Sequence, residues 1–486
     1  MDTDSDATDH GAAVVPAIDA PSSVASLRSL ARQGVQTIVV SDSATAPAVS
    51  STFCDEAVPV TSPTDDLLAY KDALVGLAMR ESVDTIVPVR EEDVYVLARY
   101  REEFAEHVET PWPTMERLAS VQDRVTLFDA AASAGVAAPE THLLSEHLDP
   151  DREWIVKSRY SILTDRYVDA PPDHCVAPPS TTYLAPGVPP DVETLRAEMG
   201  HDPLVQEYVR TPHEYGFFAL YDRGDPVATF QHRQCRGYSY AGGPSAFRES
   251  VDIPALEEAG LALLDELNWH GLAMVEFLRD EGTGEFKLME INPRFWSSLP
   301  FSVQTGADFP YYYWQLATDG CARNTDGWEV GIGGHLLRGE LLYLHSILFD
   351  DVELVDKPPL PTAIRDVVGS LVTQRRFDYL RADDPWPFLR DMRNAVAALG
   401  PDEKRDQASP GEVGRTENRR TGTTHPENRT DETDGDGSQG AEIDADESRA
   451  LEADADGSSQ SAPRSRPGPG SSQESELDVG RSEHVD

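Results

Sequence analysis

Short apolar runs alternate with amphipathic stretches over the first 110 residues of the chain. The runs are rich in Val and Ile, and the stretches between them carry apolar residues at helical spacing. Three runs predict strands and two stretches predict helices: strands at 13–17, 36–40 and 84–89, and helices at 22–32 and 91–104. A strand, a helix and a second strand in this order are typical of a parallel sheet. We therefore expect a small parallel α/β domain over residues 12–115, after a disordered start at 1–11.

The pattern continues with mixed elements between residues 117 and 318. It predicts helices at 117–133 and 253–267, strands at 153–157 and 203–209, a hairpin from 215–220 and 226–231, and an aromatic helix start at 306–314. We interpret the aromatic residues of that last segment as core and not as a stacking platform. Residues 158–190 are rich in proline and lack periodicity, so they are either an ordered excursion or a mobile loop.

A further hairpin is predicted where two apolar runs flank a turn with two glycines. If the turn centres on Thr283, Glu276 lies directly across from Glu290. Asn292 then points to the same sheet face, because side chains alternate along a strand. Two facing carboxylates repel each other, and a hard divalent cation such as Mg²⁺ would relieve that repulsion. A solvated strand face is the alternative interpretation of an isolated Glu-x-Asn.

The last third of the chain changes character twice. From residue 330 to 398 the pattern is mainly helical. After about residue 400 apolar residues almost vanish, and Gly, Ser, Pro, Asp and Glu dominate. Such a composition cannot bury enough apolar surface to fold by itself. We therefore expect a disordered acidic tail over residues 400–486.

The chain is strongly acidic, with 86 Asp and Glu against 41 Lys and Arg and a formal net charge of −45. Lysine supplies five of the basic residues, so arginine is strongly preferred. Molar salt shortens the Debye length to about 3 Å and screens such self-repulsion. The composition therefore favours a salt-rich cytoplasm, such as that of a halophilic archaeon. A tail that binds a basic partner is the alternative. The same charge argues against nucleic acid as a partner, which needs a basic surface.

Several classes of protein are disfavoured by the absence of their motifs. Four cysteines lie far apart with no Cys-x-x-Cys spacing, which indicates neither a zinc ribbon nor a disulfide scaffold. The first domain has no Gly-x-Gly-x-x-Gly loop for a dinucleotide. The N-terminus lacks the order of a signal peptide, and no apolar run reaches about 18 residues. We expect a soluble cytoplasmic protein with no membrane partner.

Residues 118–318 resemble an ATP-grasp domain of the carboxylate–amine ligase type. The order of the motifs carries the resemblance: a helix, glycine and proline lead-in at 122–141, a lysine strand at 154–157, a linker at 206–209, and the acidic hairpin. The Glu-x-Asn-x-Arg of the hairpin is the most specific of these. The resemblance implies an α/β protein with an α+β core, in which a small parallel α/β domain precedes a two-lobed ATP-grasp domain and a helical C-terminal region.

The resemblance also implies cofactors and the residues that hold them. The cofactors are ATP and Mg²⁺, with Mn²⁺ as an alternative ion. The implied cofactor-binding residues are Arg124, Lys157, Glu207, Tyr208, Val209 and Glu214, and the implied metal ligands are Glu276, Glu290 and Asn292. Lys157 would contact the α- and β-phosphates as a point charge. A surface lysine is the alternative for Lys157, and a solvated loop acid is the alternative for Glu214, the implied ribose partner.

Catalytic roles are implied for two arginines. Arg294 would neutralise charge on the transferring phosphoryl group or the acyl phosphate, and a structural ion pair with one of the hairpin carboxylates is its alternative. Arg233 and Arg236 precede Gly242 and Gly243, and arginines beside a flexible glycine loop suit an anionic substrate. A solvated basic turn is the alternative for that stretch.

Two departures from the family pattern are visible. Arg124 stands where the family often has a lysine, which keeps the charge but changes the geometry. Residues 158–186 contain no glycine, although the family's glycine-rich loop normally follows the lysine strand. The second departure puts the lid over the phosphates in doubt.

The resemblance implies an ATP-dependent ligase that activates a carboxylate as an acyl phosphate for attack by an amine, releasing ADP and phosphate. Its partners would be small-molecule carboxylate and amine substrates, and a homodimer is left open. Two alternatives remain: a non-catalytic ATP-binding regulatory protein of the same fold, and a carboxylating ligase.

Overall fold

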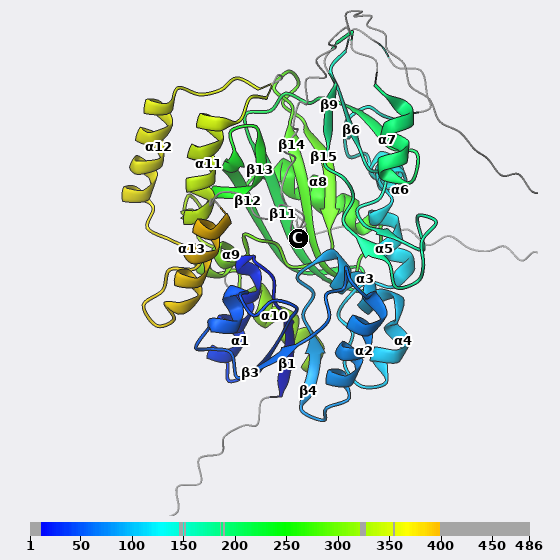
Figure 1. Ribbon diagram of the computed structural model, residues 1–486, viewed down its shortest axis with the longest axis vertical. Coiled ribbons are helices and arrows are strands. Elements are labelled where there is room, and N and C mark those ends of the chain that lie inside the picture. Colours follow the sequence, from blue (N-terminus) through cyan, green and yellow to red (C-terminus); the bar gives the residue numbers. More distant parts are fainter. Residues whose placement is uncertain are drawn as a thin grey trace, which may run out of the picture. The chain divides into compact units, whose positions relative to one another are not determined.

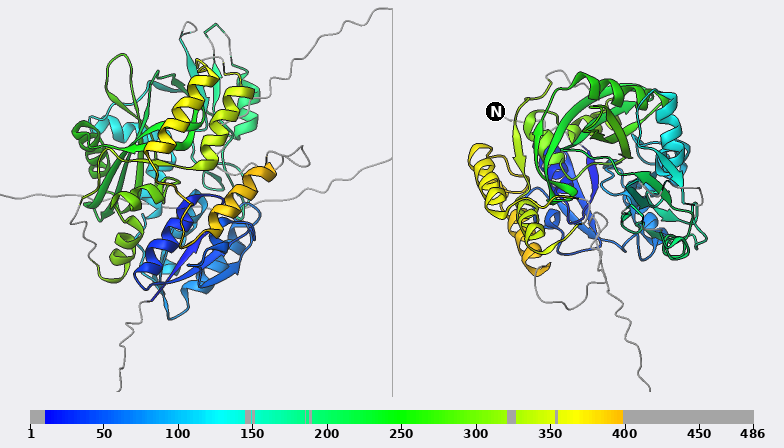
Figure 2. Two further views of the ribbon diagram at one scale, coloured as in Figure 1. Left: turned by 90° about the vertical axis from the view of Figure 1, so that its left-hand side faces the viewer. Right: turned by 90° about the horizontal axis from the view of Figure 1, so that it is seen from above.

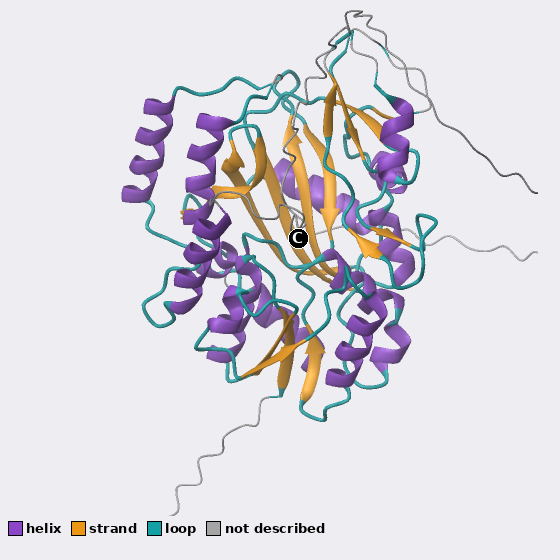
Figure 3. Cartoon of the chain, in the orientation of Figure 1, coloured by secondary structure: helices purple, strands orange, loops and turns teal. Residues whose placement is uncertain are grey.

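The structure is a computed structural model, and it describes residues 11–144, 149, 152–184, 186–187, 190–320, 327–352 and 355–398. Gly11 apart, the stretches predicted to be disordered, 1–11 and 400–486, lie outside these residues. Helices, strands and loops of the described part are distinguished in Figure 3.

A four-stranded parallel sheet begins the chain, as the alternating pattern predicted. Its strands are β1 (Ala12–Pro16), β2 (Gln36–Ser41), β3 (Glu56–Pro59) and β4 (Val83–Ile86). Its helices are α1 (Pro21–Arg32), the 3₁₀ turn η1 (Pro47–Ser50), α2 (Leu67–Ala78), α3 (Glu91–Arg99) and α4 (Arg101–Ala105). The pattern did not predict β3 or α2. The strand β3 is short and half exposed, so its apolar signal is weak.

The strand order of this first sheet is β3-β2-β1-β4 (Figure 1). The chain therefore moves outward from β1 on one side and later adds β4 on the other. Neighbouring strands whose connections leave in opposite directions form a topological switch point, and ligands bind outside the carboxyl ends of the strands there. Pro88 and Arg90 follow β4 at this edge of the sheet.

A second, antiparallel sheet has the order β5-β10-β6-β9. Its strands are β5 (Thr141–Leu143), β6 (Trp154–Lys157), β9 (Thr182–Leu184) and β10 (Leu204–Glu207). The helix α7 (Val192–Met199) packs on it, whereas α5 (Met115–Gln122) and α6 (Arg124–Ser133) pack on β15 (Phe286–Asn292). Side chains of β6, β9, β10 and α7 share a small core of their own, separate from the two large clusters.

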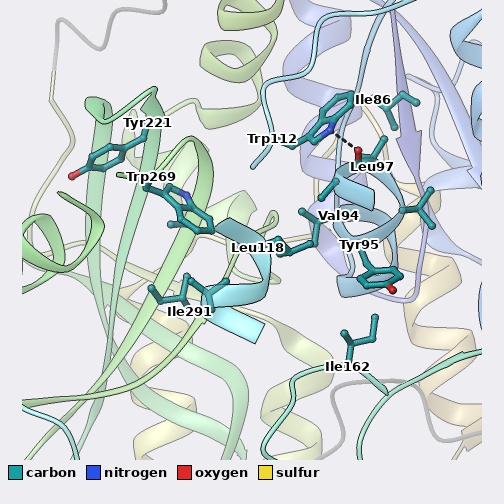
Figure 4. Close-up of a cluster of buried hydrophobic side chains, with 14 of the residues drawn as sticks. Ile86, Val94, Tyr95, Leu97, Trp112, Leu118, Ile162, Tyr221, Trp269 and Ile291 are labelled. Atoms are coloured by element: carbon teal, nitrogen blue, oxygen red, sulfur yellow. Dashed lines mark hydrogen bonds between the residues drawn. The ribbon is translucent and has the colours of Figure 1, made fainter. Parts of the chain in front are cut away.

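The segment that joins β6 to β9 is an ordered excursion and not a mobile loop. It contains a short pair of strands, β7 (Leu163–Thr164) and β8 (Cys175–Val176). Ile162 and Cys175 are buried in the same cluster as Tyr95 of α3, and Figure 4 shows Ile162 and Tyr95 in that cluster. Arg99 pairs with Asp165 across the same contact. The segment is thus packed against the first domain.

A six-stranded antiparallel sheet dominates the rest of the chain, in the order β15-β14-β11-β12-β13-β16. Its strands are β11 (Glu214–Asp222), β12 (Asp225–Ser239), β13 (Gly242–Ser250), β14 (Gly271–Arg279), β15 (Phe286–Asn292) and β16 (Gly333–His335). The helix α8 (Pro254–Glu266) covers one face, where a Cβ on Gly260 would clash with the Phe217 ring. That glycine permits the helix to approach the sheet closely.

The prediction of a flexible glycine loop around residues 232–245 was wrong. Residues up to 239 belong to β12, and β13 begins at Gly242. A Cβ on Gly237 would lie 2.5 Å from the Gly242 carbonyl oxygen, and Gly242 and Gly243 have φ angles of 123° and 95°. These glycines therefore serve close strand approach and a tight turn, as glycines inside strands often do.

Five more helices of the described chain follow the hairpin: α9 (Leu299–Thr305), α10 (Phe309–Thr318), α11 (Leu337–Phe349), α12 (Leu360–Thr373) and α13 (Trp386–Ala398). Among them, α10 and α11 pack on strands of the large sheet. Phe309, Tyr313 and Trp314 of α10 are buried, which confirms that the aromatic segment is core. The helix α11 packs on β12 and β13, and α12 lies beside α11 (Figure 2). Within the described residues, no helix has the length and apolar character needed to cross a membrane.

Candidate nucleotide and metal site

The hairpin β14–β15 has the predicted register, with Glu276 directly opposite Glu290. A bulge follows between Glu276 and Phe277. Asn292 lies on the same face, and its side-chain amide donates to Glu276 Oε1 at 3.0 Å and to Glu290 Oε1 at 3.2 Å. The expectation that these three side chains share one face is confirmed. The amide nitrogen bridges two carboxylates that otherwise face each other.

Two basic side chains interact with this pair of carboxylates, one from α6 and one from β6. Arg124, at the start of α6, donates from Nη2 to Glu290 Oε2 at 2.8 Å. Its Nη1 donates to the carbonyl oxygens of Ser158 and Tyr160 at 2.9 and 3.2 Å. Lys157, the last residue of β6, is 7% exposed. Burial and the neighbouring Arg124 lower the pKa of Lys157 to about 7, although Glu290 and Glu276 oppose them.

The two hairpin carboxylates have opposite electrostatic surroundings. Burial, then Glu290 and Glu214, raise the pKa of Glu276 well above its ordinary value. Burial would also raise the pKa of Glu290, but Arg124 and Lys157 outweigh it and hold that pKa below its ordinary value. One carboxylate is thus matched by cations of the chain, while the other has a deficit of positive charge.

Glu214, at the start of β11, belongs to the same face. It accepts a hydrogen bond from Gln234 Nε2 at 2.8 Å. Burial and the charge of Glu290 raise its pKa to about 7. The structure therefore brings Glu214 toward the hairpin carboxylates and does not leave it as a solvated loop acid. Three carboxylates share this electrostatic environment, and Glu276 and Glu214 lack a basic partner within ion-pair distance among the described residues.

The linker after β10 is only partly available to a ligand. The Glu207 side chain pairs with Lys287 at 2.6 Å and with Arg152 at 2.8 Å. The main-chain N–H of Glu207 donates to the Glu140 carbonyl, and that of Tyr208 donates to the Glu153 carbonyl. Of the three linker residues predicted to bind the cofactor, Val209 has a main-chain N–H with no acceptor among the described residues.

Arg294 leaves the hairpin toward the first domain. Its Nη2 donates to Asn292 Oδ1 at 3.0 Å, and its Nε donates to Glu91 Oε1 at 2.9 Å. The next residue continues the contact, because the Phe295 N–H donates to the Pro88 carbonyl at 3.0 Å. The ion pair foreseen for Arg294 therefore exists, but with a carboxylate of the first domain and not with one of the hairpin.

The start of α3 thus joins the site, which the sequence reasoning missed. Glu91 and Glu92 each keep a buried oxygen, and Arg90 keeps a buried Nη2, without a partner among the described residues. Burial, opposed by Arg294, raises the pKa of Glu91 to about 7. A signal was present: Val-Arg-Glu-Glu follows an apolar strand directly, and the carboxyl end of a parallel strand is where ligands bind.

Arg233 is the predicted residue that the structure does not bring to the others. It pairs with Tyr215 in the register of β11 and β12, whereas the neighbouring Gly216 pairs with Glu276. Since side chains alternate along a strand, Arg233 points to the opposite face of the sheet. There it forms an ion pair with Glu249 at 2.6 Å. The structure therefore does not bring Arg233 to the hairpin carboxylates, and the catalytic role implied for it stays a prediction.

The donor set of the hairpin face fits a divalent cation. Glu276, Glu290 and Asn292 offer hard oxygen ligands, and a cation would supply the positive charge that Glu276 lacks. The described residues contain no group of three or more His, Cys, Asp and Glu side chains that could hold a metal by themselves. The residues present therefore fit a cation whose remaining ligands come from a bound molecule, as Mg²⁺ takes them from phosphates.

Comparison with known proteins was made by family model, by sequence and by structure. No family model and no curated protein matches the chain. Solved structures do match. The biotin carboxylase domain of 2-oxoglutarate carboxylase from Hydrogenobacter thermophilus, solved with MgADP, ADP and bicarbonate, gives a TM-score of 0.51 at 16% identity and covers 66% of this chain and 73% of that chain.

A biotin carboxylase from Campylobacter jejuni, in a β,γ-ATP complex, gives a TM-score of 0.50 at 13% identity over 66% of this chain and 74% of that chain. N5-carboxyaminoimidazole synthetase from Staphylococcus aureus gives 0.48 at 15% identity over 66% and 80%. At identities of 16% and 13%, the likeness to the first two structures shows a shared fold.

Proposed function

We propose that the chain is an ATP- and Mg²⁺-dependent ligase that activates a carboxylate as an acyl phosphate for attack by an amine. The observation that carries this proposal is the register of the hairpin, which puts Glu276, Glu290 and Asn292 on one face beside Lys157 and Arg124. Carboxylates, an amide and two cations at one place suit a metal-bound polyphosphate better than any neutral ligand. The ATP-grasp fold supports the same interpretation.

The roles of the residues follow from their positions. Glu276, Glu290 and Asn292 would hold Mg²⁺, which when bound neutralises the phosphates during transfer. Lys157 and Arg124 would contact the phosphates, and the linker at Val209 and the carboxylate of Glu214 would hold the nucleoside. Phosphoryl transfer depends mainly on such positioning and charge stabilisation.

The second half of the reaction is assigned to the edge of the first sheet. There Arg294 faces Glu91 beside the switch point of β1 and β4. The substrate carboxylate oxygen would attack the γ-phosphorus and release ADP, and Arg294 would stabilise the charge of the acyl phosphate. The amine nitrogen would then attack the acyl carbon and release phosphate. Glu91, whose pKa is raised to about 7, would accept the proton that the amine loses.

The proposal is tested by Mg²⁺-dependent ADP release from the full chain across a library of carboxylates and amines. Turnover should require one member of each class. Glu290→Gln should lower it by about 10²-fold or more, because removing one charge-stabilising group at such a site costs that much. Glu285→Gln is the matched control, since Glu285 is exposed in the turn of the same hairpin. Unchanged ADP release by Glu290→Gln would contradict the metal assignment.

Two alternative functions are outcomes of the same screen. A carboxylating ligase is favoured by the structural likeness to biotin carboxylases, one of them solved with bicarbonate, and it predicts ADP release that depends on bicarbonate. A non-catalytic ATP-binding protein is favoured by the segment after β6, which lacks glycine and is packed against the first domain. That function predicts tight ATP binding with no ADP released by any pair of substrates.

A further inference from the structure

A surface pocket of about 360 Å³ lies in the loop between α12 and α13, which can be followed in Figure 1. Its lining residues are Gln304, Arg375, Arg376, Phe377, Leu380, Arg381, Ala382 and Asp383. We call it the arginine pocket. Three guanidinium groups thus come from seven consecutive residues of a chain whose net charge is −45. None of the residues assigned to the nucleotide site lines it.

The backbone of this loop is held by buried and partly buried side chains on both sides. Arg28 of α1 donates to the carbonyl oxygens of Asp378 and Tyr379 at 3.2 and 2.9 Å. The Asp378 carboxylate pairs with Arg248 of β13, and both side chains are almost fully buried. Gln304 of α9 donates to the Phe377 carbonyl at 3.0 Å. Because the loop is tied to α1, β13 and α9, the arginines project from a fixed frame, which reduces the ordering cost of binding.

The positive charge of the pocket is only partly matched. Arg375 donates from Nε to the Val372 carbonyl at 3.1 Å, and no carboxylate of the described residues lies within ion-pair distance of it. Arg376 pairs at 2.9 Å with Glu329, whose side chain is 63% exposed. Such exposed pairs contribute little, so an incoming anion can compete for the guanidinium.

The carboxylate that lines the pocket is already shared. Asp383 pairs with Arg381 at 3.1 Å inside the pocket and with Arg32 of α1 at 2.7 Å outside it. The hydrogen bond from Arg32, followed by that from Arg381, holds the pKa of Asp383 at about 2. Two arginines thus compete for one charge. The pocket keeps an excess of positive charge and unfilled N–H donors, principally on Arg375.

We propose that the arginine pocket binds a small organic polycarboxylate. Guanidinium groups bind carboxylates through paired, charge-assisted hydrogen bonds, and several of them favour an anion with more than one carboxylate. The volume is at the lower end for ligand pockets, which fits a molecule much smaller than a nucleotide. Phe377 and Leu380 supply an apolar wall that a carbon chain can contact and inorganic phosphate cannot. This inference does not depend on the proposed ligase activity.

The test is calorimetric titration of the full chain with succinate, citrate and inorganic phosphate. Chloride is kept constant, because salt screens exposed charges. The expected result is saturable binding of succinate or citrate with one site per chain. The inference is overturned if neither carboxylate binds saturably, or if phosphate alone does.

Two single-site variants locate the binding. Arg375→Gln should weaken binding of the carboxylate by about tenfold or more, in line with the loss of one charge-assisted pair. Arg375 is exposed, and its side chain makes one hydrogen bond within the described residues, to the Val372 carbonyl, so its replacement should leave the far-ultraviolet circular dichroism unchanged. Arg365→Gln is the control, because Arg365 is an exposed arginine of α12 outside the pocket, paired with Asp366. Equal affinity in all three proteins would show that the pocket is not the site.

Discussion

The hairpin β14–β15 and the segment from 158 to 181 both carry acidic residues, but they differ in whether those carboxylates have a basic partner. Two ion pairs join the segment to its neighbours. Asp165 of the segment pairs with Arg99, and Arg159 of the segment pairs with Asp123 at 2.6 Å. On the hairpin face, Glu276 is left with a raised pKa beside other carboxylates. Acids that are paired hold a fold together, whereas unpaired acids at a buried position indicate that a cation is to be supplied from outside.

The first prediction concerns the buried contact between the segment and the first domain. Ile162→Ala should lower the free energy of unfolding by about 2–5 kcal/mol, as expected for a buried isoleucine, and Leu288→Ala on the hairpin should do the same. Arg166→Ala, an exposed change in the same segment, should stay within about 0.5 kcal/mol. Urea unfolding measures all three. If Ile162→Ala cost no more than Arg166→Ala, the segment would be a mobile loop after all.

A second prediction uses pH, because the two regions should respond with opposite signs. Folded Glu214 has a pKa of about 7 against an ordinary 4.5, so the folded state holds its proton longer and loses stability as pH rises through this window. Glu214→Gln should therefore become more stable than the parent between pH 4.5 and 7. Folded Asp165 has a lowered pKa, through the hydrogen bond from Arg99, so its contribution is present above the ordinary 3.8 and lost as pH falls.

The measurement is the thermal midpoint of the parent, Glu214→Gln and Asp165→Asn from pH 3 to 8. The difference between Glu214→Gln and the parent should grow with pH and level off above pH 7. Asp165→Asn should be less stable than the parent at pH 7, and this gap should narrow toward the acid end. If the difference in thermal midpoint between Glu214→Gln and the parent did not change with pH, the inferred deficit of positive charge at the site would be contradicted.

The smallest expected effect on stability concerns the partly exposed ion pair between Arg99 and Asp165. Arg99→Gln removes the contacts of Arg99 to Asp165 and to the Tyr95 hydroxyl, and should cost about 1 kcal/mol, because the pair is partly exposed. A double-mutant cycle with Asp165→Asn should give a coupling energy of about 0.5–1 kcal/mol. A coupling of zero would mean that apolar packing alone holds the segment in place.

The local features of the molecule could be predicted from the sequence, and the non-local ones could not. The facing of Glu276 and Glu290 follows from one turn and the alternation of side chains, so it could be derived. The position of Glu91 depends on β4 joining the sheet beside β1, a pairing of residues about 70 positions apart in the chain. The sequence shows that charged residues follow the apolar strand β4, but it does not show which residues lie next to them in the fold.

Arg233 shows the opposite kind of failure, where a correct local observation was given a wrong meaning. The glycines near it were noticed and taken as a flexible loop. In the structure Gly237 permits close approach to the Gly242 backbone, and β12 continues past Arg233. Glycine is required both by loops and by closely packed strands, so composition alone cannot separate the two.

The contact between the first sheet and the residues after the hairpin relies mainly on atoms that side-chain mutation leaves in place. The Phe295 N–H meets the Pro88 carbonyl, and the Tyr313 hydroxyl meets the Ile86 carbonyl at 3.0 Å. Three of these four groups are main-chain atoms, which are present whichever residue is encoded, except that proline lacks the N–H. Replacing Phe295 or Pro88 therefore changes packing but can keep the bond. The alignment of Arg294 with the first domain should consequently survive extensive drift of the sequence around it.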